Sequence, residues 1–384
     1  MTATAHASVP PASFPPLPPD TTGPLLERVG QVVRRDLAPL VKAIDKDHLY
    51  PAGVLRALGE AGAYAPHIAA LNGGRIDLAA SIKAMSVVGR ECLSTAFCVW
   101  CQSTFAWYAD NTANASLRAR LAAAAGSGAQ LGGTGLSNPM KSFFEIEKLR
   151  LKGTRVAGGY VVRGMLPWVS NLGPDHVFGT IFETDEASPR RVMAMIPCDH
   201  PGVSIVPTGA HLALDGTGTY SVQIRDAMIG DDLVLADPAE PYVRKVRQGF
   251  ILLQMGMAFG VIRGCIDIQR QVQPSLGHVN KFLEDQPDEL EAALEAAEAE
   301  CWDLAQAPYE EEGGRWRRTL QARLAGSYLA LRAAQAAMLH SGARGYVEAG
   351  AAQRRLREAY FVAIVTPATK QLKKMLAELE AAGA

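Results

Sequence analysis

The chain has 384 residues, of which 48% are hydrophobic and 20% are charged, and its formal net charge at pH 7 is −1. This length allows two or three domains with a large apolar core, and the composition is ordinary for a globular protein. The small net charge argues against binding to nucleic acid or to an acidic membrane surface. Because glycine and polar residues interrupt the longest apolar runs, the sequence predicts no membrane span.

The N-terminal segment 1–23 is rich in proline, alanine, threonine and serine and lacks the basic and apolar regions of a secretory signal. We therefore expect a disordered tail there. Six cysteines are few for this length, which favours a reducing, cytoplasmic location over a disulfide framework. Cys98 and Cys101 have CxxC spacing, but they lie in an apolar helical run, which predicts core packing rather than a metal or redox site.

Three segments with different hydrophobic periods follow. Residues 24–128 have helical spacing, and helices are expected over 24–45, 51–63, 76–92, 93–111 and 115–125. Residues 129–242 alternate with a period of two, which predicts short strands over 148–156, 159–165, 176–183, 191–197, 203–207 and 220–229 in a small β-barrel or sandwich. Residues 243–384 return to helix, over 249–271, 280–307, 315–343, 351–363 and 370–382, which predicts a four-helix bundle. The expected fold class is therefore α+β, mainly α.

Common catalytic and metal-binding motifs are missing from the sequence. It contains no GxGxxG after a strand, no GxxxxGK[ST], no HExxH and no GxSxG. Its eight histidines include no pair three or four residues apart, so no metal site is predicted.

The segment 131–178 says most about function. A glycine-rich turn bearing the hydroxyls of Thr134 and Ser137 leads into alternating strands that end at Trp168-Val169-Ser170. Two interpretations of Trp168 are open. It is either a strand side chain that fills the core or a wall against a planar ring, with Ser170 near a ring nitrogen and the hydroxyls of 134–137 at the polar edge of the ring.

The succession of helical domain, β-domain and helical bundle resembles the acyl-CoA dehydrogenase superfamily over residues 24–382. Local segments carry the resemblance. Residues 55–62 (LRALGEAG) resemble a family helix, 135–139 (GLSNP) its TEP segment, 167–171 (PWVSN) its W-I-T-N segment, 214–219 (LDGTGT) its barrel hairpin and 342–346 (GARGY) its GG.GY segment.

This resemblance implies FAD as cofactor, a small acyl thioester as substrate, and a homotetramer or homodimer in which a neighbouring subunit completes the flavin site. The residues it assigns to the cofactor are Thr134, Leu136, Ser137, Ser142, Trp168, Ser170, Gln273, Ser275, Gly342 and Thr369.

Departures from the family pattern concern the catalytic base and the flavin phosphates. Family dehydrogenases remove the substrate α-proton with a glutamate, but Thr366 or Pro367 occupies one expected position and Gly260 the other, so the catalytic residue is unknown. Neither a hydroxyl nor proline is a useful general base. The arginine that reaches the flavin diphosphate is absent around Gln273, which costs about 1.5–3 kcal/mol of binding.

Three functional hypotheses follow. The first is a flavin-dependent oxidoreductase of the superfamily acting on an acyl-CoA or similar small substrate. The second is altered chemistry, such as a flavin monooxygenase or a CoA-thioester desulfinase or lyase, in which Arg263 holds an anionic substrate group; a surface or interface charge is the other interpretation of Arg263. The third is a flavin-free, non-catalytic homologue that serves as a partner subunit.

Overall fold

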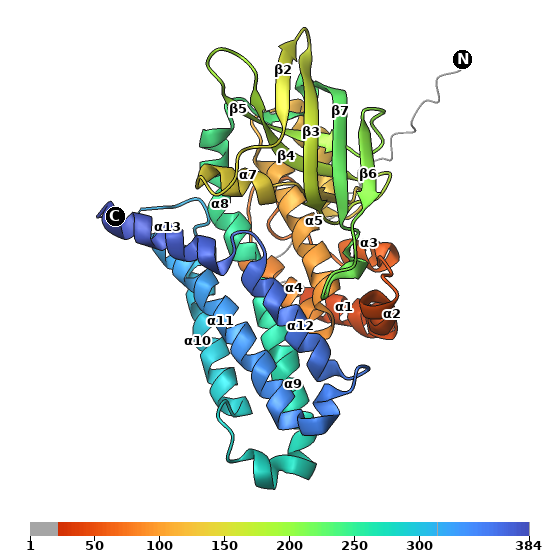
Figure 1. Ribbon diagram of the computed structural model, residues 1–384, viewed down its shortest axis with the longest axis vertical. Helices are drawn as coiled ribbons and strands as arrows, with labels where there is room; N and C mark the ends of the chain where they lie inside the picture. The colour runs from red at the N-terminus through yellow and green to blue at the C-terminus, as the bar shows by residue number, and fades with distance from the viewer. Residues whose placement is uncertain (1–21, 313, 384) are drawn as a thin grey trace.

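The computed structural model describes residues 22–312 and 314–383. Of the segment 1–23 expected to be a tail, residues 1–21 lie outside the described part, whereas Thr22 and Gly23 belong to the first helix. Figure 1 shows the sheet at one end of the molecule, the long C-terminal helices at the other, and α5 between them. This agrees with the expected α+β, mainly helical architecture.

The N-terminal helical domain differs from expectation mainly at its start. The chain leaves α-helical geometry between residues 33 and 40, where Pro39 lacks the N–H needed to continue the ladder. Side-chain caps open two later helices: Asp77 accepts from the Ala80 N–H at 2.8 Å, and Asn114 accepts from the Leu117 N–H at 3.2 Å. The elements are α1 (Thr22–Val32), a π-helical turn (Val33–Leu37), a 3-10 turn (Ala38–Leu40), α2 (Val41–Lys46), α3 (Ala52–Glu60), a 3-10 turn (Ala69–Leu71), α4 (Leu78–Glu91), α5 (Leu93–Asn111) and α6 (Ala115–Gly126).

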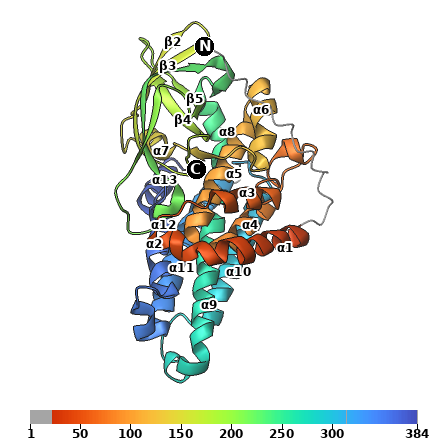
Figure 2. The ribbon, with the colours of Figure 1, turned by 90° about the vertical axis from the view of Figure 1, so that its right-hand side faces the viewer.

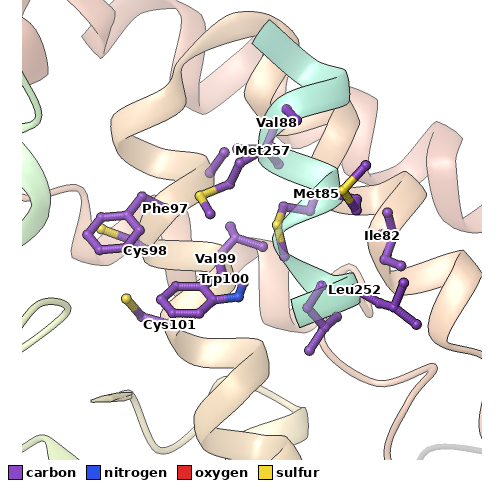
Figure 3. Close-up of a cluster of buried hydrophobic side chains, with 14 of the residues drawn as sticks. Ile82, Met85, Val88, Phe97, Cys98, Val99, Trp100, Cys101, Leu252 and Met257 are labelled. Carbon is purple, nitrogen blue, oxygen red and sulfur yellow. The ribbon is translucent and has the colours of Figure 1, made fainter. Parts of the chain in front are cut away.

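Helix α5 is the centre of the core, because every one of its 19 residues is buried. Figure 3 shows its side chains packed with those of α4 and of the C-terminal helices. Cys98 and Cys101 lie among these apolar groups as free thiols, and burial raises the pKa of both well above the ordinary value. The CxxC spacing is therefore explained by core packing, as expected.

His67, at the interface of α4 and α5, gives the fold a specific acid sensitivity. Its Nε2 lies 2.9 Å from the Ser103 carbonyl oxygen and its Nδ1 lies 2.7 Å from Ser81 Oγ, so the neutral ring is fully hydrogen-bonded. Burial lowers the pKa of His67 from 6.5 to about 4. The unfolded chain therefore binds a proton between these values that the folded chain does not.

We expect the free energy of unfolding to fall by up to about 3 kcal/mol on this account as the pH drops from roughly 6.5 to 4. Urea unfolding across this range measures it. The matched variant is His67→Gln, whose amide does not titrate, so its stability should depend less on pH. Equal pH dependence in the two proteins would contradict the assignment.

The β-domain is one mixed sheet. Its hydrogen-bonded path runs β6-β7-β3-β2-β4-β5-β8, with β1 parallel to β4. The path does not close, but the sheet curls around its own apolar core, to which β3 contributes Tyr160, β4 contributes Phe178 and β7 contributes Ile224. The strands are β1 (Gly132–Thr134), β2 (Lys152–Val156), β3 (Gly159–Val169), β4 (Val177–Thr184), β5 (Arg191–Pro197), β6 (Val203–Pro207), β7 (Tyr220–Gly230) and β8 (Val234–Ala236).

The glycine-rich segment 132–135, which was expected to be a turn and contains β1, allows its backbone to pack closely against neighbouring backbone. A Cβ at Gly133 would lie 2.2 Å from the Ser170 carbonyl oxygen. Because glycine has no Cβ, β1 approaches the end of β3, and Thr134 forms an isolated antiparallel bridge with Ser170. A short helix that was not predicted, α7 (Ser137–Phe143), follows directly.

The C-terminal helices form the expected bundle with shifted boundaries. The helix expected over 249–271 begins earlier, at residue 239, and is divided at Gln254 into α8 and α9. The helix expected over 280–307 begins only at residue 287, after a turn at 281–286. Pro287 at the first helical position, with Gln286 and Glu289 in a capping box, starts α10. The helices are α8 (Ala239–Leu253), α9 (Met255–Asn280), α10 (Pro287–Ala305), α11 (Arg315–Ser341), α12 (Ala351–Ile364) and α13 (Thr369–Ala381).

The run 239–280 is apolar enough by length and composition to cross a membrane, which differs from the expectation drawn from the interrupted apolar runs. Its most apolar 18-residue window has a mean hydropathy of 1.6, but 94% of that window is buried inside the protein. In Figure 2, α9 runs beside α10 and α11. Packing against other helices therefore accounts for the apolar character of this segment.

Candidate active site

A cavity of about 690 Å³ lies where the β-domain meets α5, α8, α12 and α13. Residues from distant parts of the sequence meet there. Those on its β-domain side are Thr134, Leu136, Ser137, Lys141, Ile146, Glu147, Trp168, Ser170, His211, Leu212, Ala213, Leu214, Thr217 and Thr219. The helical side contributes Phe97, Trp100, Phe250, Arg357, Tyr360, Phe361, Ile364, Val365, Thr366, Ala368, Thr369, Lys370 and Gln371.

Trp168 is the main apolar surface on the β-domain side. It points away from the sheet core, because its neighbour Val169 is fully buried while Trp168 is 54% exposed. Exposure of this size excludes the interpretation in which the indole fills the core. A large ring left open on a cavity wall is typical of a ligand-binding surface.

Several hydroxyl groups share the cavity wall with Trp168, and three of them are linked to one another. Ser170 Oγ lies 2.6 Å from Thr219 Oγ1, which lies 2.7 Å from Thr217 Oγ1. Thr134 Oγ1 lies 3.1 Å from the hydroxyl of Tyr108 on α5. Because a hydroxyl has one hydrogen and two lone pairs, each of these groups retains capacity to bond the polar edge of a ligand.

The opposite wall is aromatic and was not found from the sequence. Phe97 and Trp100 come from α5, Phe250 from α8, and Tyr360 and Phe361 from α12. Phe97 packs edge-on against Phe361 with centroids 4.5 Å apart. These residues lie on helices with apolar faces, so their spacing gives no sign that they face a cavity instead of the core.

Neither position expected for the glutamate base carries one. Thr366 does line the cavity, 3.2 Å from Ser137 Oγ through its own Oγ1. Gly260 does not line it: a Cβ there would lie 2.5 Å from the Gly89 Cα on α4, so the crossing of α4 and α9 requires glycine. Helix α8 contributes Phe250 to the cavity wall, and this side chain has no basic group.

Glu147 is the sole carboxylate among the described residues that line the cavity. Lys141 Nζ donates to it at 2.8 Å and Asn138 Nδ2 at 3.1 Å. The hydrogen bond from Lys141 and that from Asn138 hold the pKa of Glu147 below its ordinary value. A carboxylate engaged in this way is a weak proton acceptor.

Behind Thr366 lies a buried arginine that has no carboxylate partner among the described residues. Gln254 Nε2 donates to the Thr366 carbonyl oxygen at 2.8 Å, and Gln254 Oε1 accepts from Arg323 Nε at 2.6 Å. Arg323 also donates to the Val362 carbonyl oxygen at 2.6 Å. Burial lowers the pKa of Arg323 to about 10. Hydrogen bonds to neutral acceptors therefore hold this cation in place below the cavity floor.

Of the predicted cofactor residues, Thr134, Leu136, Ser137, Trp168, Ser170 and Thr369 meet at the cavity. The others do not line it within one chain. Ser142 is buried and donates to the Pro139 carbonyl oxygen at 2.7 Å, and Ser275 donates to the Val272 carbonyl oxygen at 3.1 Å. Gln273 and Ser275 lie on the distal half of α9, and Gly342 follows the end of α11, so these three residues lie away from the cavity within this chain.

Arg263 also lies away from the cavity, which corrects its assignment as a substrate-binding residue within this chain. Its Nη2 contacts both carboxylate oxygens of Glu298 at 2.7 Å, joining α9 to α10. This ion pair agrees with the other interpretation of Arg263, in which it is a charge at an interface between helices.

Comparison with known proteins identifies the fold. Residues 20–129 match the family described as acyl-CoA dehydrogenase, N-terminal domain. Benzylmalonyl-CoA dehydrogenase of Aromatoleum aromaticum is 24% identical over 235 residues, which cover 60% of this chain and 62% of that protein. The human mitochondrial short-chain specific acyl-CoA dehydrogenase is 21% identical over 372 residues, covering 89% of this chain and 85% of the human protein.

Solved structures of other proteins have the same fold. A glutaryl-CoA dehydrogenase in complex with glutaryl-CoA superposes with a TM-score of 0.85 at 18% identity, over 96% of this chain and 97% of that one. The family model, which matches residues 20–129, and these relatives place the chain with the acyl-CoA dehydrogenase superfamily, whose fold it has. The same fold serves other chemistry: dibenzothiophene monooxygenase from Paenibacillus sp. A11-2 has a TM-score of 0.77 at 17% identity, over 94% and 97% of the chains. Structures with this fold have been determined with FMN, FADH2 and FAD.

Proposed function

We propose that this superfamily member is a flavin-dependent oxidoreductase acting on an acyl-CoA or a similar small substrate. The observation that carries the proposal is the cavity wall on which exposed Trp168 lies among linked hydroxyl groups. A flavin ring system is flat and apolar on its faces and has polar atoms along one edge. The indole of Trp168 fits a face, and Thr134, Ser137 and Ser170 fit the polar edge.

Lys370 and the start of α13 supply a place for the cofactor phosphates. Thr369, Lys370 and Gln371 form the first turn of this 13-residue helix and line the cavity. First-turn N–H groups and the positive end of the helix dipole favour an anion, and a nearby ammonium adds to the attraction. A second copy of the chain would add Gln273, Ser275 and Gly342, which is why we propose a homodimer or homotetramer.

When bound, the flavin would supply a two-electron acceptor, and the residues of the chain bind and orient the substrate beside it. The aromatic wall of Phe97, Trp100, Phe250 and Phe361 excludes water and suits the apolar part of an acyl group. Thr366 stands where the resemblance places a glutamate. Any proton acceptor must therefore come from another part of the cavity.

The first test is the visible spectrum of the purified protein. We expect flavin absorption bands and stoichiometric flavin after reconstitution with FAD, because the ring contacts are intact even without the diphosphate arginine. Protein that remains colourless after reconstitution would contradict the proposal and favour a flavin-free partner subunit. Flavin-containing protein is then mixed anaerobically with a panel of saturated acyl-CoA thioesters, and bleaching identifies a dehydrogenase.

A second candidate is a superfamily enzyme with altered chemistry, above all a flavin monooxygenase. The absence of a free carboxylate from the described cavity wall favours it, since Glu147 is held by Lys141. The fold is compatible with such a reaction, as the dibenzothiophene monooxygenase shows. Flavin that no saturated thioester bleaches, but whose chemically reduced form transfers one oxygen atom of O2 into an organic substrate, would distinguish this candidate from the first.

A further inference from the structure

The connection between β6 and β7 places a histidine–aspartate pair on the cavity wall. His211 lines the cavity, and its Nδ1 lies 2.7 Å from Asp215 Oδ1. The same oxygen accepts from the His211 backbone N–H at 2.9 Å. Because a carboxylate accepts but does not donate, Nδ1 carries the ring hydrogen, and Nε2 has a free lone pair. An imidazole oriented through Nδ1 in this manner is arranged as a base at Nε2.

This connection is fixed in position by its neighbours. A Cβ at Gly216 would lie 2.6 Å from the Ile44 carbonyl oxygen, so the turn after Asp215 is pressed against α2. The Thr217 carbonyl oxygen accepts from the Asn171 N–H at 2.9 Å. The His211–Asp215 pair is therefore fixed in position relative to Trp168, at the end of β3, and to Ser170, which directly follows that strand. It does not lie on an isolated surface loop.

Three charged or titratable groups approach the pair from other elements. His48, in the turn after α2, has its Nδ1 3.7 Å from Asp215 Oδ2. Arg357 on α12 donates to the Leu212 carbonyl oxygen at 3.0 Å, but its charge is paired with Asp45 on α2 through contacts of 2.9 and 2.6 Å. Asp215 is thus the carboxylate available to an imidazolium at position 211.

We propose that His211, held by Asp215, is the proton-transfer group of this cavity. The inference rests on the proposed flavin-dependent function. In the step, Nε2 bonds to the acidic hydrogen of the bound substrate as its C–H or O–H bond breaks. The electron pair of that bond stays on the substrate, and the new positive charge on the imidazolium lies beside the carboxylate of Asp215. His211 thereby supplies the basic group that Thr366 and Gly260 lack.

The test uses the flavin-loaded protein and needs no identified substrate. The midpoint potential of the bound flavin is measured against pH in wild type and in His211→Gln. A proton-exchanging group in the cavity takes up a proton as reduction adds negative charge, so the plot for wild type should have a bend beyond the one that the ionisation of the reduced flavin itself produces. The His211→Gln plot should retain only the bend of the flavin itself, with flavin content unchanged. Asp215→Asn should alter the additional bend, because it removes the carboxylate beside the imidazolium.

The matched control is His48→Gln, which changes a histidine near Asp215 that does not line the cavity, and it should keep the wild-type bend. A His211→Gln plot with the same shape as that of wild type would overturn the role of His211 and leave the flavin proposal standing. Protein that binds no flavin would overturn both.

Discussion

Trp168→Ala is expected to weaken flavin binding by about 2–3 kcal/mol, or roughly 30- to 150-fold in Kd. Trp168 is the largest exposed side chain on the β-domain wall of the cavity, and alanine leaves the ring face in contact with water. The fold should be retained, because the side chain contributes nothing to the core of the sheet. Fluorescence or absorbance titration of apoprotein with FAD measures the loss.

Two further variants separate stacking from general damage to the sheet. Trp168→Phe keeps an aromatic face and should recover most of the affinity. Met165→Ala truncates an exposed side chain of the same strand that does not line the cavity, and it should bind flavin as wild type does. Wild-type affinity in Trp168→Ala, or an equal loss in Met165→Ala, would refute the stacking role.

The sequence predicted much of the β-domain wall of the cavity, because residues that are close in sequence form it. Strands 191–197 and 203–207 match β5 and β6 residue for residue, because alternation and flanking turns define them. Trp168 lies at the end of β3 and Ser170 directly follows that strand, while Thr134 ends β1 and Ser137 begins α7. Of the six predicted cofactor residues that line the cavity, local pattern indicated Thr134, Ser137, Trp168 and Ser170, whereas the family resemblance supplied Leu136 and Thr369.

The other wall was not predictable in this way. Phe250 and Phe361 are more than a hundred residues apart and lie on helices whose apolar faces look like core in sequence. His211 and Asp215 lie four residues apart, but no periodic element marks them, and their meaning depends on the cavity that only the folded chain forms. Arg263 illustrates the same limit, because from the sequence its charge fitted either a ligand or an interface, and the fold shows its partner Glu298 on the next helix.

The two positions at which the glutamate is absent have different surroundings. Position 366 faces the cavity, so a carboxylate would fit there, and its replacement by threonine changes the chemistry of the site. Position 260 is a packing position between two helices. Of these two positions, only 366 therefore affects the chemistry of the cavity. The histidine on the wall opposite the helices is the group placed to supply the missing base.

Gly260→Ala is expected to destabilise the protein by roughly 4 kcal/mol, well above the usual cost of an extra methyl group in a core. The added Cβ would meet the Gly89 Cα at 2.5 Å and its carbonyl carbon at 2.6 Å, and both are backbone atoms that cannot rotate away. Helices α4 and α9 would have to separate. Urea unfolding measures the loss, with Gly53→Ala as the matched control, because that helical glycine has no atom within 4 Å of its Cβ position and alanine there should be neutral or slightly stabilising. A Gly260→Ala protein as stable as wild type would show that the two helices do not cross as closely as described, and position 260 would again be open to a side chain facing the cavity.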